Sequence, residues 1–161
     1  MLRYISFDIV FQEIPGEITL AINISNCPNR CKSCHSPHLR ENTGETLDEN
    51  AIAALLDKYG KAITCICFMG GDAEPRKVER LAAFVRTAAG RKIKTGWYSG
   101  RAALPDDVSL LSFDYIKLGE YIEHLGGLNA HTTNQRFYSI ENGTMTDITD
   151  MFWNKVYNKK K

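Results

Sequence analysis

Three cysteines stand close together early in the chain, in the stretch Asn26 to His38. Cys27, Cys31 and Cys34 follow a C-x3-C-x2-C spacing, so their thiols can converge on one metal centre only if the backbone wraps around it. Pro28 fixes its own φ angle, which suits such a wrap. Three thiolates are one fewer than structural zinc and ordinary iron–sulfur sites normally take. The spacing therefore predicts a metal centre with one open coordination position.

Two other uses of these cysteines are chemically reasonable. A zinc ion could take the three thiolates together with His35 or His38 as a fourth ligand. A disulfide framework is the weaker alternative, because the five cysteines are odd in number and residues 1–4 lack the long apolar run of a secretory signal. We therefore expect reduced thiols, as in a cytoplasmic protein.

The cysteine loop resembles that of the radical S-adenosylmethionine (SAM) enzymes, in which C-x3-C-x2-C follows the first strand. The resemblance implies that Cys27, Cys31 and Cys34 hold a [4Fe–4S] cluster whose fourth iron is chelated by SAM. The flanking residues, Asn26-Cys27-Pro28 before the run and His35-Ser36-Pro37 after it, are most similar to the activating proteins of anaerobic ribonucleoside-triphosphate reductase.

The residues around the third cysteine add to this resemblance. Ser33 favours the activator branch, because many other radical SAM enzymes have an aromatic residue at that position. The resemblance implies that Ser33, Cys34 and His35 lie along SAM, near its adenine. For His35, a solvent-exposed place in the loop is an equally good interpretation.

The elements that must position this loop belong to a single domain, residues 1–161. Apolar residues make up 43% and charged residues 24% of the chain, as in ordinary globular proteins. A formal charge of +1 gives no indication of a nucleic-acid groove. No apolar run approaches the ~20 residues needed to span a bilayer. We therefore expect neither a nucleic acid nor a membrane as partner.

Strands and helices alternate along most of the chain. Apolar patterns predict strands at residues 3–11, 18–24, 62–68, 93–97 and 115–118, and helices at 46–60, 75–90 and 105–111, the first with a capping box at Thr46 and Glu49. This order predicts parallel strands. A complete eight-fold barrel needs ~250 residues, so we expect an α/β fold that is a partial (β/α) barrel of the radical SAM type. Residues 136–140 and 144–148 flank Asn142-Gly143 and predict a small C-terminal β-hairpin appendage.

Unusual residues follow successive strands of this series. They are the cysteine loop, Gly70-Gly71-Asp72, Tyr98-Ser99-Gly100 and Gly119-Glu120. Ligands of α/β folds bind at the carboxyl ends of strands, so these residues should gather on one rim. Gly70, Gly71 and Asp72 resemble the G-G-E motif, whose backbone carbonyls receive the SAM amino group in the family. Tyr98 and Ser99 could contact SAM, or could form a plain turn after a strand.

Two further groups of residues allow more than one interpretation. The T-T-N-Q-R segment at residues 132–136 is similar to the S-S-N-Q-R segment of reductase activators, which makes Asn134 and Arg136 candidates for SAM binding. Arg136 could instead bind the partner protein or join the last strand to the sheet. Cys65 and Cys67 lie within an apolar run, so we interpret them as packing residues.

The resemblance to the reductase activators predicts a glycyl-radical-enzyme activase. The resemblance implies reductive cleavage of SAM and removal of a hydrogen atom from a glycine of anaerobic ribonucleoside-triphosphate reductase, with an electron donor such as flavodoxin or ferredoxin. No catalytic side chain is expected beyond the cluster ligands. Residues 11–17 depart from the usual turn of such activators, so an activase of another glycyl-radical enzyme is one alternative. A zinc-stabilised binding module is the alternative outside the enzymes.

Overall fold

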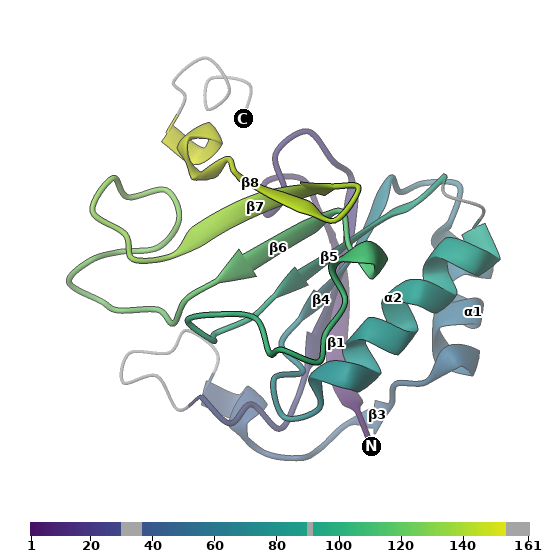
Figure 1. Cartoon of the computed structure of the whole chain (residues 1–161). Coiled ribbons are helices and arrows are strands. Elements are labelled where there is room, and N and C mark those ends of the chain that lie inside the picture. Colours follow the sequence, from purple (N-terminus) through teal and green to yellow (C-terminus); the bar gives the residue numbers. More distant parts are fainter. Residues whose placement is uncertain (30–36, 90–91, 154–161) are drawn as a thin grey trace.

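The computed structural model describes residues 1–29, 37–89 and 92–153, which share one mixed eight-stranded sheet with the order β3-β1-β2-β4-β5-β6-β7-β8. The strands are β1 (Arg3–Val10), β2 (Thr19–Ile24), β3 (Glu45–Thr46), β4 (Cys65–Met69), β5 (Lys94–Tyr98), β6 (Tyr115–Leu118), β7 (Arg136–Glu141) and β8 (Thr144–Asp147). The α-helices are α1 (Glu49–Tyr59) and α2 (Pro75–Ala89), and the 3-10 helices are η1 (Pro37–Arg40), η2 (Leu110–Ser112) and η3 (Thr149–Trp153). Figure 1 shows both α-helices on the same side of the sheet.

The centre of the sheet is parallel, as the alternation of strands and helices predicts. Strands β2, β4, β5 and β6 pair in parallel, with Ile22 opposite Phe68 and Trp97 opposite Ile116. Parallel strands that are covered on both faces have almost continuous apolar sequences. The run Cys65–Met69 has this composition, and four of its five side chains are buried.

The expected partial (β/α) barrel is wrong. The described residues form an eight-stranded mixed sheet with only two α-helices, whereas a radical SAM barrel would be rich in helices. Strand β1 runs antiparallel to β2, and β7 runs antiparallel to β6 and β8. Among the described residues, no α-helix joins β5 to β6, because the predicted helix at 105–111 is replaced by a turn at Pro105 and the short η2. The structure is therefore an open mixed sheet.

Two details at other element ends also differ from the expectations. Helix α1 is present, but its N-cap is Asp48, whose carboxylate accepts the Ala51 N–H at 2.9 Å. Thr46, the predicted cap, lies in β3 and pairs with Arg3. The hairpin of β7 and β8 is confirmed, with Asn142 and Gly143 at the positive φ angles that such a tight turn requires. It extends the main sheet and is not a separate appendage.

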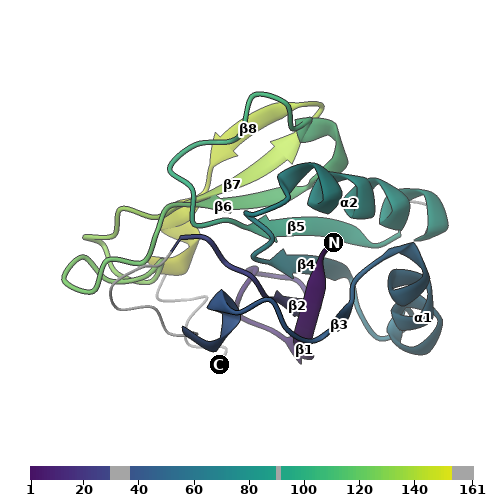
Figure 2. The ribbon, with the colours of Figure 1, turned by 90° about the horizontal axis from the view of Figure 1, so that it is seen from below.

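Hydrophobic side chains pack on both faces of the sheet. The larger cluster lies between the sheet and the helices and contains Leu20, Ile22, Ile66, Phe68, Trp97 and Ile116 from the strands with Ile52, Val78, Leu81 and Val85 from the helices. The smaller cluster covers the other face and contains Ile14, Cys65, Cys67, Leu128 and Phe137. In Figure 2 no α-helix of the described residues covers this second face, and connecting segments such as residues 11–18 supply the cover instead.

Candidate functional site

The carboxyl ends of the four parallel strands lie next to one another, and we call the residues that follow them the rim: 26–29 after β2, 70–72 after β4, 99–101 after β5 and 119–120 after β6. Backbone hydrogen bonds join neighbouring parts of the rim. Gly70 N–H donates to Tyr98 O at 3.0 Å, and Gly119 N–H donates to Arg101 O at 2.7 Å. The gathering of these residues at one edge of the sheet agrees with the expectation from their places after successive strands.

The cysteine loop leaves the sheet at the rim and is closed at its base. Cys27 N–H donates to Leu39 O at 2.8 Å and Asn26 N–H donates to Glu41 O at 3.0 Å, so the outgoing and returning backbone lie side by side. Asn26 has a φ of 62°, which turns the chain sharply after β2. Cys27 is half-buried. The other predicted ligands and neighbours, Cys31, Ser33, Cys34 and His35, lie outside the described residues.

The glycine shelf, Gly70 and Gly71, has left-handed backbone angles of +108° and +88°. A Cβ atom on Gly71 would lie 2.5 Å from Val78 Cγ2, so glycine is required there for packing against α2. Both carbonyls already accept hydrogen bonds: Gly70 O from Trp97 Nε1 at 2.7 Å and Gly71 O from Glu74 N at 3.0 Å. Backbone angles, packing and hydrogen bonds within the fold therefore explain both glycines. Binding of the SAM amino group to their carbonyls stays a prediction.

Asp72 joins three parts of the rim. Its side chain is buried, and Oδ1 accepts the Ser99 hydroxyl at 2.6 Å while Oδ2 accepts Gly100 N–H at 2.9 Å. Oδ2 also accepts the side-chain amide of Asn29 from the cysteine loop. The main-chain oxygen of Asp72 accepts Arg101 Nη2 at 2.7 Å. A buried carboxylate is stable only when donors satisfy it, and here those donors come from the loops after β2 and β5.

Tyr98 and Ser99 point to different places. The Ser99 hydroxyl serves Asp72, as described above. The Tyr98 ring packs against Phe137 on the helix-free face, and its hydroxyl donates to Glu13 O. Burial, with the nearby Cys67 as a smaller cause, raises the pKa of Tyr98 well above its ordinary value. Tyr98 therefore stays a neutral phenol, and contact between either residue and SAM stays a prediction.

The T-T-N-Q-R segment holds the connection between β6 and β7 in place. Thr132 and Thr133 donate to the carbonyls of Leu125 and Gly126 at 2.6 and 3.0 Å. Asn134 Nδ2 donates to Glu120 O at 3.1 Å on the rim. These bonds show how a run of polar residues can be required for the shape of a loop.

Arg136 begins β7 opposite Leu118, so its backbone lies near the rim. Its side chain forms an ion pair with Asp147 of β8, with 2.9 Å between Nε and Oδ2. The interpretation in which Arg136 joins the last strands to the sheet agrees with this contact, and its binding of SAM is untested.

Sequence reasoning missed three polar residues in or directly beside the rim. Asn29 and Arg101 contact Asp72 as described above. Lys117 is only 8% exposed, and its Nζ donates to the carbonyls of Ser99 and Gly119, both at 2.9 Å, and lies 5.6 Å from the centre of the Tyr98 ring. A lysine inside an otherwise apolar strand is a signal that could have drawn attention to this position, because lysine is rarely buried without partners.

Residues 1–29, 37–89 and 92–153 contain no group of three His, Cys, Asp or Glu side chains that could hold a metal ion. Two of the three cysteines of the predicted cluster lie outside these ranges, so the prediction is not tested. Within the same ranges, no helix has both the length and the apolar character needed to cross a membrane.

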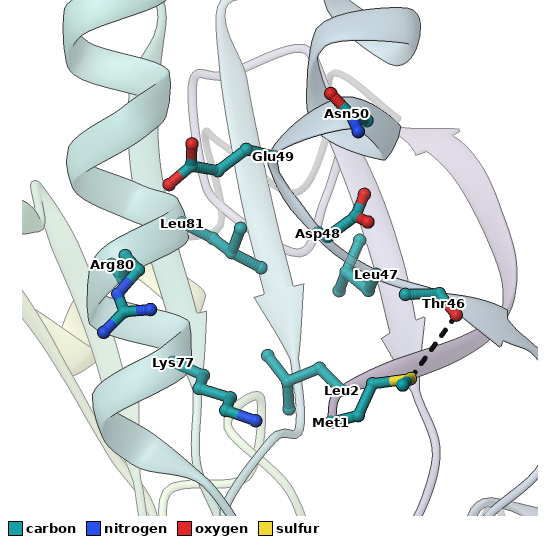
Figure 3. A pocket seen from close by; sticks show the side chains of 10 residues that line it. All are labelled: Met1, Leu2, Thr46, Leu47, Asp48, Glu49, Asn50, Lys77, Arg80 and Leu81. Carbon is teal, nitrogen blue, oxygen red and sulfur yellow. Dashed lines mark hydrogen bonds between the residues drawn. The ribbon is translucent and has the colours of Figure 1, made fainter.

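A separate pocket of about 370 Å³ lies between α2 and the segment that enters α1 (Figure 3). Leu47 and Leu81 form part of its apolar floor, and Asp48, Glu49 and Arg80 stand around it. Charges of both signs line it, so it selects for neither an anion nor a cation. None of the predicted site residues belongs to it.

Comparisons with known proteins do not assign a class. No protein-family model matches the chain, and no curated protein or solved structure is significantly similar to it.

Proposed function

We propose that this chain is a radical SAM activase that generates the glycyl radical of anaerobic ribonucleoside-triphosphate reductase. One observation carries the proposal beyond the cysteine spacing. The Asn29 amide contacts both the Cys27 sulfur, at 3.7 Å, and the Asp72 carboxylate, so the first cysteine of the run adjoins the residues after the glycine shelf. In the family that the sequence resembles, the cluster and the glycine motif bind the same end of SAM, the one that carries its amino group.

The residues present fit a cluster that has one open iron. Three thiols within eight positions supply three soft ligands, and the closed base of the loop brings its two ends together. Cys27, Cys31 and Cys34 would hold the cluster, and the rim would face SAM. When bound, the cluster supplies the electron that cleaves SAM and so provides the radical that removes the glycine hydrogen.

The protein itself orients these groups. Asp72 fixes the loops after β2, β4 and β5 relative to one another, which keeps the rim in one arrangement. Because the sheet is open and its rim is not enclosed by a barrel, a glycine-bearing loop of a large partner could approach from outside. An electron donor such as flavodoxin or ferredoxin and a reducing, anaerobic cytoplasm belong to the same proposal, since reduced clusters and glycyl radicals are sensitive to oxygen.

A zinc-stabilised binding module is the second candidate. It is favoured by the hydrogen bonds that the Gly70 and Gly71 carbonyls already accept within the fold, because these glycines then need no ligand. Activation of another glycyl-radical enzyme would use the same residues, and would differ only in the partner.

Metal analysis of anaerobically purified protein separates the two classes. The activase requires iron and sulfide, with a brown absorption near ~400 nm that is expected for thiolate-bound clusters. Colourless protein with stoichiometric zinc would support the binding module instead.

The partner is tested by mixing the reduced protein, SAM and the reductase. Electron paramagnetic resonance should then show a doublet from the single α-hydrogen of a glycyl radical, which collapses to a singlet when glycine is deuterated at Cα. Cleavage of SAM without a radical on the reductase would rule out this partner.

A further inference from the structure

We propose that Asn29 is a positioning residue for Cys27: its side-chain amide is anchored on the buried Asp72 carboxylate and directs its second N–H at the Cys27 sulfur. This inference rests on the proposed function in that it treats Cys27 as a cluster ligand. It adds a residue that the cysteine motif does not include, and it gives the Asp72 side chain a role that differs from contact with SAM.

The contacts of Asn29 account for both hydrogens of its amide. Nδ2 donates to Asp72 Oδ2, and it lies 3.7 Å from Cys27 Sγ, within reach of an N–H···S hydrogen bond. A primary amide has two N–H donors that point in different directions. One side chain can therefore bind the carboxylate and the sulfur at the same time.

The anchor is rigid because Asp72 is held from several sides. It is only 1% exposed, and the Ser99 hydroxyl and Gly100 N–H bind its two oxygens at 2.6 and 2.9 Å. Side chains near a metal ligand are most effective when their own partners fix them. The position of the Asn29 amide is thus set by the ends of β4 and β5.

Gly100 leaves the room that this arrangement needs. A Cβ atom at position 100 would lie 2.7 Å from Asn29 Nδ2, closer than real Cβ atoms approach, and 3.1 Å from Asn29 Cγ. Asn29 therefore lies directly over the Gly100 backbone. Gly100 serves the cysteine loop through this contact, with no ligand required.

A hydrogen bond to a thiolate withdraws charge from the sulfur, and hydrogen bonds to sulfur are among the factors that set the reduction potential of an iron–sulfur cluster. Loss of the Asn29 N–H should therefore lower the potential. Asp72 acts on the sulfur only through Asn29, so its effect should disappear once Asn29 is gone.

The first experiment measures the reduction potential of the reconstituted full-length protein without SAM. Asn29→Leu removes both donors and should lower the potential, and Asp72→Ala should also lower it, because it removes the oxygen that holds the Asn29 amide. The double variant should show no further change beyond Asn29→Leu, because residues that act in series are not additive. Asn23→Leu is the matched control, because that amide binds Ser6 Oγ at 3.0 Å and should leave the potential unchanged. Equal potentials in wild type and Asn29→Leu, or additive shifts in the double variant, would overturn the inference.

The second experiment needs no iron, so it separates this inference from the proposed function. In metal-free protein, nuclear magnetic resonance should show one Asn29 side-chain proton that exchanges with solvent about tenfold or more slowly than those of the exposed Asn50, as expected for a hydrogen bond that is stable by ~1.4 kcal/mol. The slow signal should be lost in Asp72→Ala, which removes both acceptor oxygens. Fast exchange in the wild type would overturn the inference even if the protein binds a cluster. A slow amide in a protein that takes up only zinc would instead overturn the proposed function and leave the link from Asp72 to Asn29 standing.

Discussion

Tyr115 donates its hydroxyl to Glu17 Oε2 across 2.7 Å, which links the first residue of β6 to the segment before β2. The same oxygen is 3.1 Å from Lys94 Nζ, and Thr64 Oγ1 donates to the other carboxylate oxygen at 2.7 Å. These partners lie at the amino-terminal ends of β4, β5 and β6, at the edge of the sheet opposite the rim. Glu17 therefore stabilises the sheet without touching the candidate site.

Replacing Glu17 with Gln should destabilise the fold and leave the site intact. Gln keeps the shape but loses the charge, which weakens hydrogen bonds from Tyr115 and Lys94. Because bonds to charged groups contribute more than neutral ones, the free energy of unfolding should fall by about 1–3 kcal/mol. Urea denaturation measures the change, and Glu141→Gln, at the exposed end of β7, should alter it little. A decrease no greater than that of the control would show that the hydrogen bonds of Glu17 contribute nothing to the stability of the fold.

Lowering the pH should remove the stabilisation that the Glu17 carboxylate provides. Burial alone would raise the pKa of Glu17, but hydrogen bonds from Tyr115, Thr64 and Lys94 outweigh it and hold the pKa below the ordinary 4.5. Since the folded pKa is the lower one, the stabilisation is complete above the unfolded pKa and is lost as the pH falls through the folded pKa. The difference in unfolding free energy between wild type and Glu17→Gln should therefore shrink below about pH 4.5. A difference that stays constant on acidification would contradict this assignment.

Gly71→Ala should destabilise the protein through a clash with Val78. The new methyl group would lie 2.5 Å from Val78 Cγ2 at a φ of +88°, so strain and overpacking together should cost about 2–5 kcal/mol. Gly16→Ala is a matched control, because Gly16 has a φ of +84° and nothing within 4 Å of its Cβ position, and it should cost only about 1–2 kcal/mol.

The clash itself is tested by a second substitution. Val78→Ala removes the blocking methyl groups, so a double-mutant cycle with Gly71→Ala should give a favourable coupling of at least ~0.5 kcal/mol. Strictly additive effects would mean that the cost comes from the backbone angle alone.

Cys65→Ala and Cys67→Ala should keep the metal, whereas Cys27→Ala should lose it. Both strand cysteines are fully buried, and burial raises the pKa of each thiol well above its usual range, so neither is available as a thiolate. Each replacement should lower the unfolding free energy by only about 1 kcal/mol, a typical cost for a buried position. Iron content after anaerobic reconstitution checks the assignment, and loss of iron in either strand variant would overturn it.

The parallel centre of the sheet could be predicted because its signals are local. The apolar run around Ile66 and the spacing of Val78, Leu81 and Val85 both reflect which side chains are buried. That the sheet stays open could not be predicted in the same way. Closure of a sheet into a barrel depends on the direction of every strand and on a helix in each connection between parallel strands. The antiparallel pairing of β6 with β7 decides the outcome, and it is formed by residues far apart along the chain.

For the candidate site, too, some features could be predicted from the sequence and others could not. That the rim residues would meet could be inferred from their places after successive strands, because parallel strands end at one edge. The role of Asp72 could not, since its partners Asn29 and Gly100 are 43 and 28 residues away. No local pattern reports such contacts. Gly71 is the opposite case. Its local Gly-Gly pattern suggests a ligand site, but packing against Val78 explains this glycine without any ligand.

The pairing of β2 with β4 has a consequence for the order of folding events. Thr19 is opposite Cys65, so this parallel pair closes a long loop that contains the cysteine run. Contacts between such distant residues form late and slowly, because the chain must first lose the entropy of loop closure. Asn29 and Asp72 can meet only after that step. We therefore expect the native sheet to assemble first and to accept the proposed cluster afterwards, so that refolding rates in stopped-flow experiments should not depend on iron.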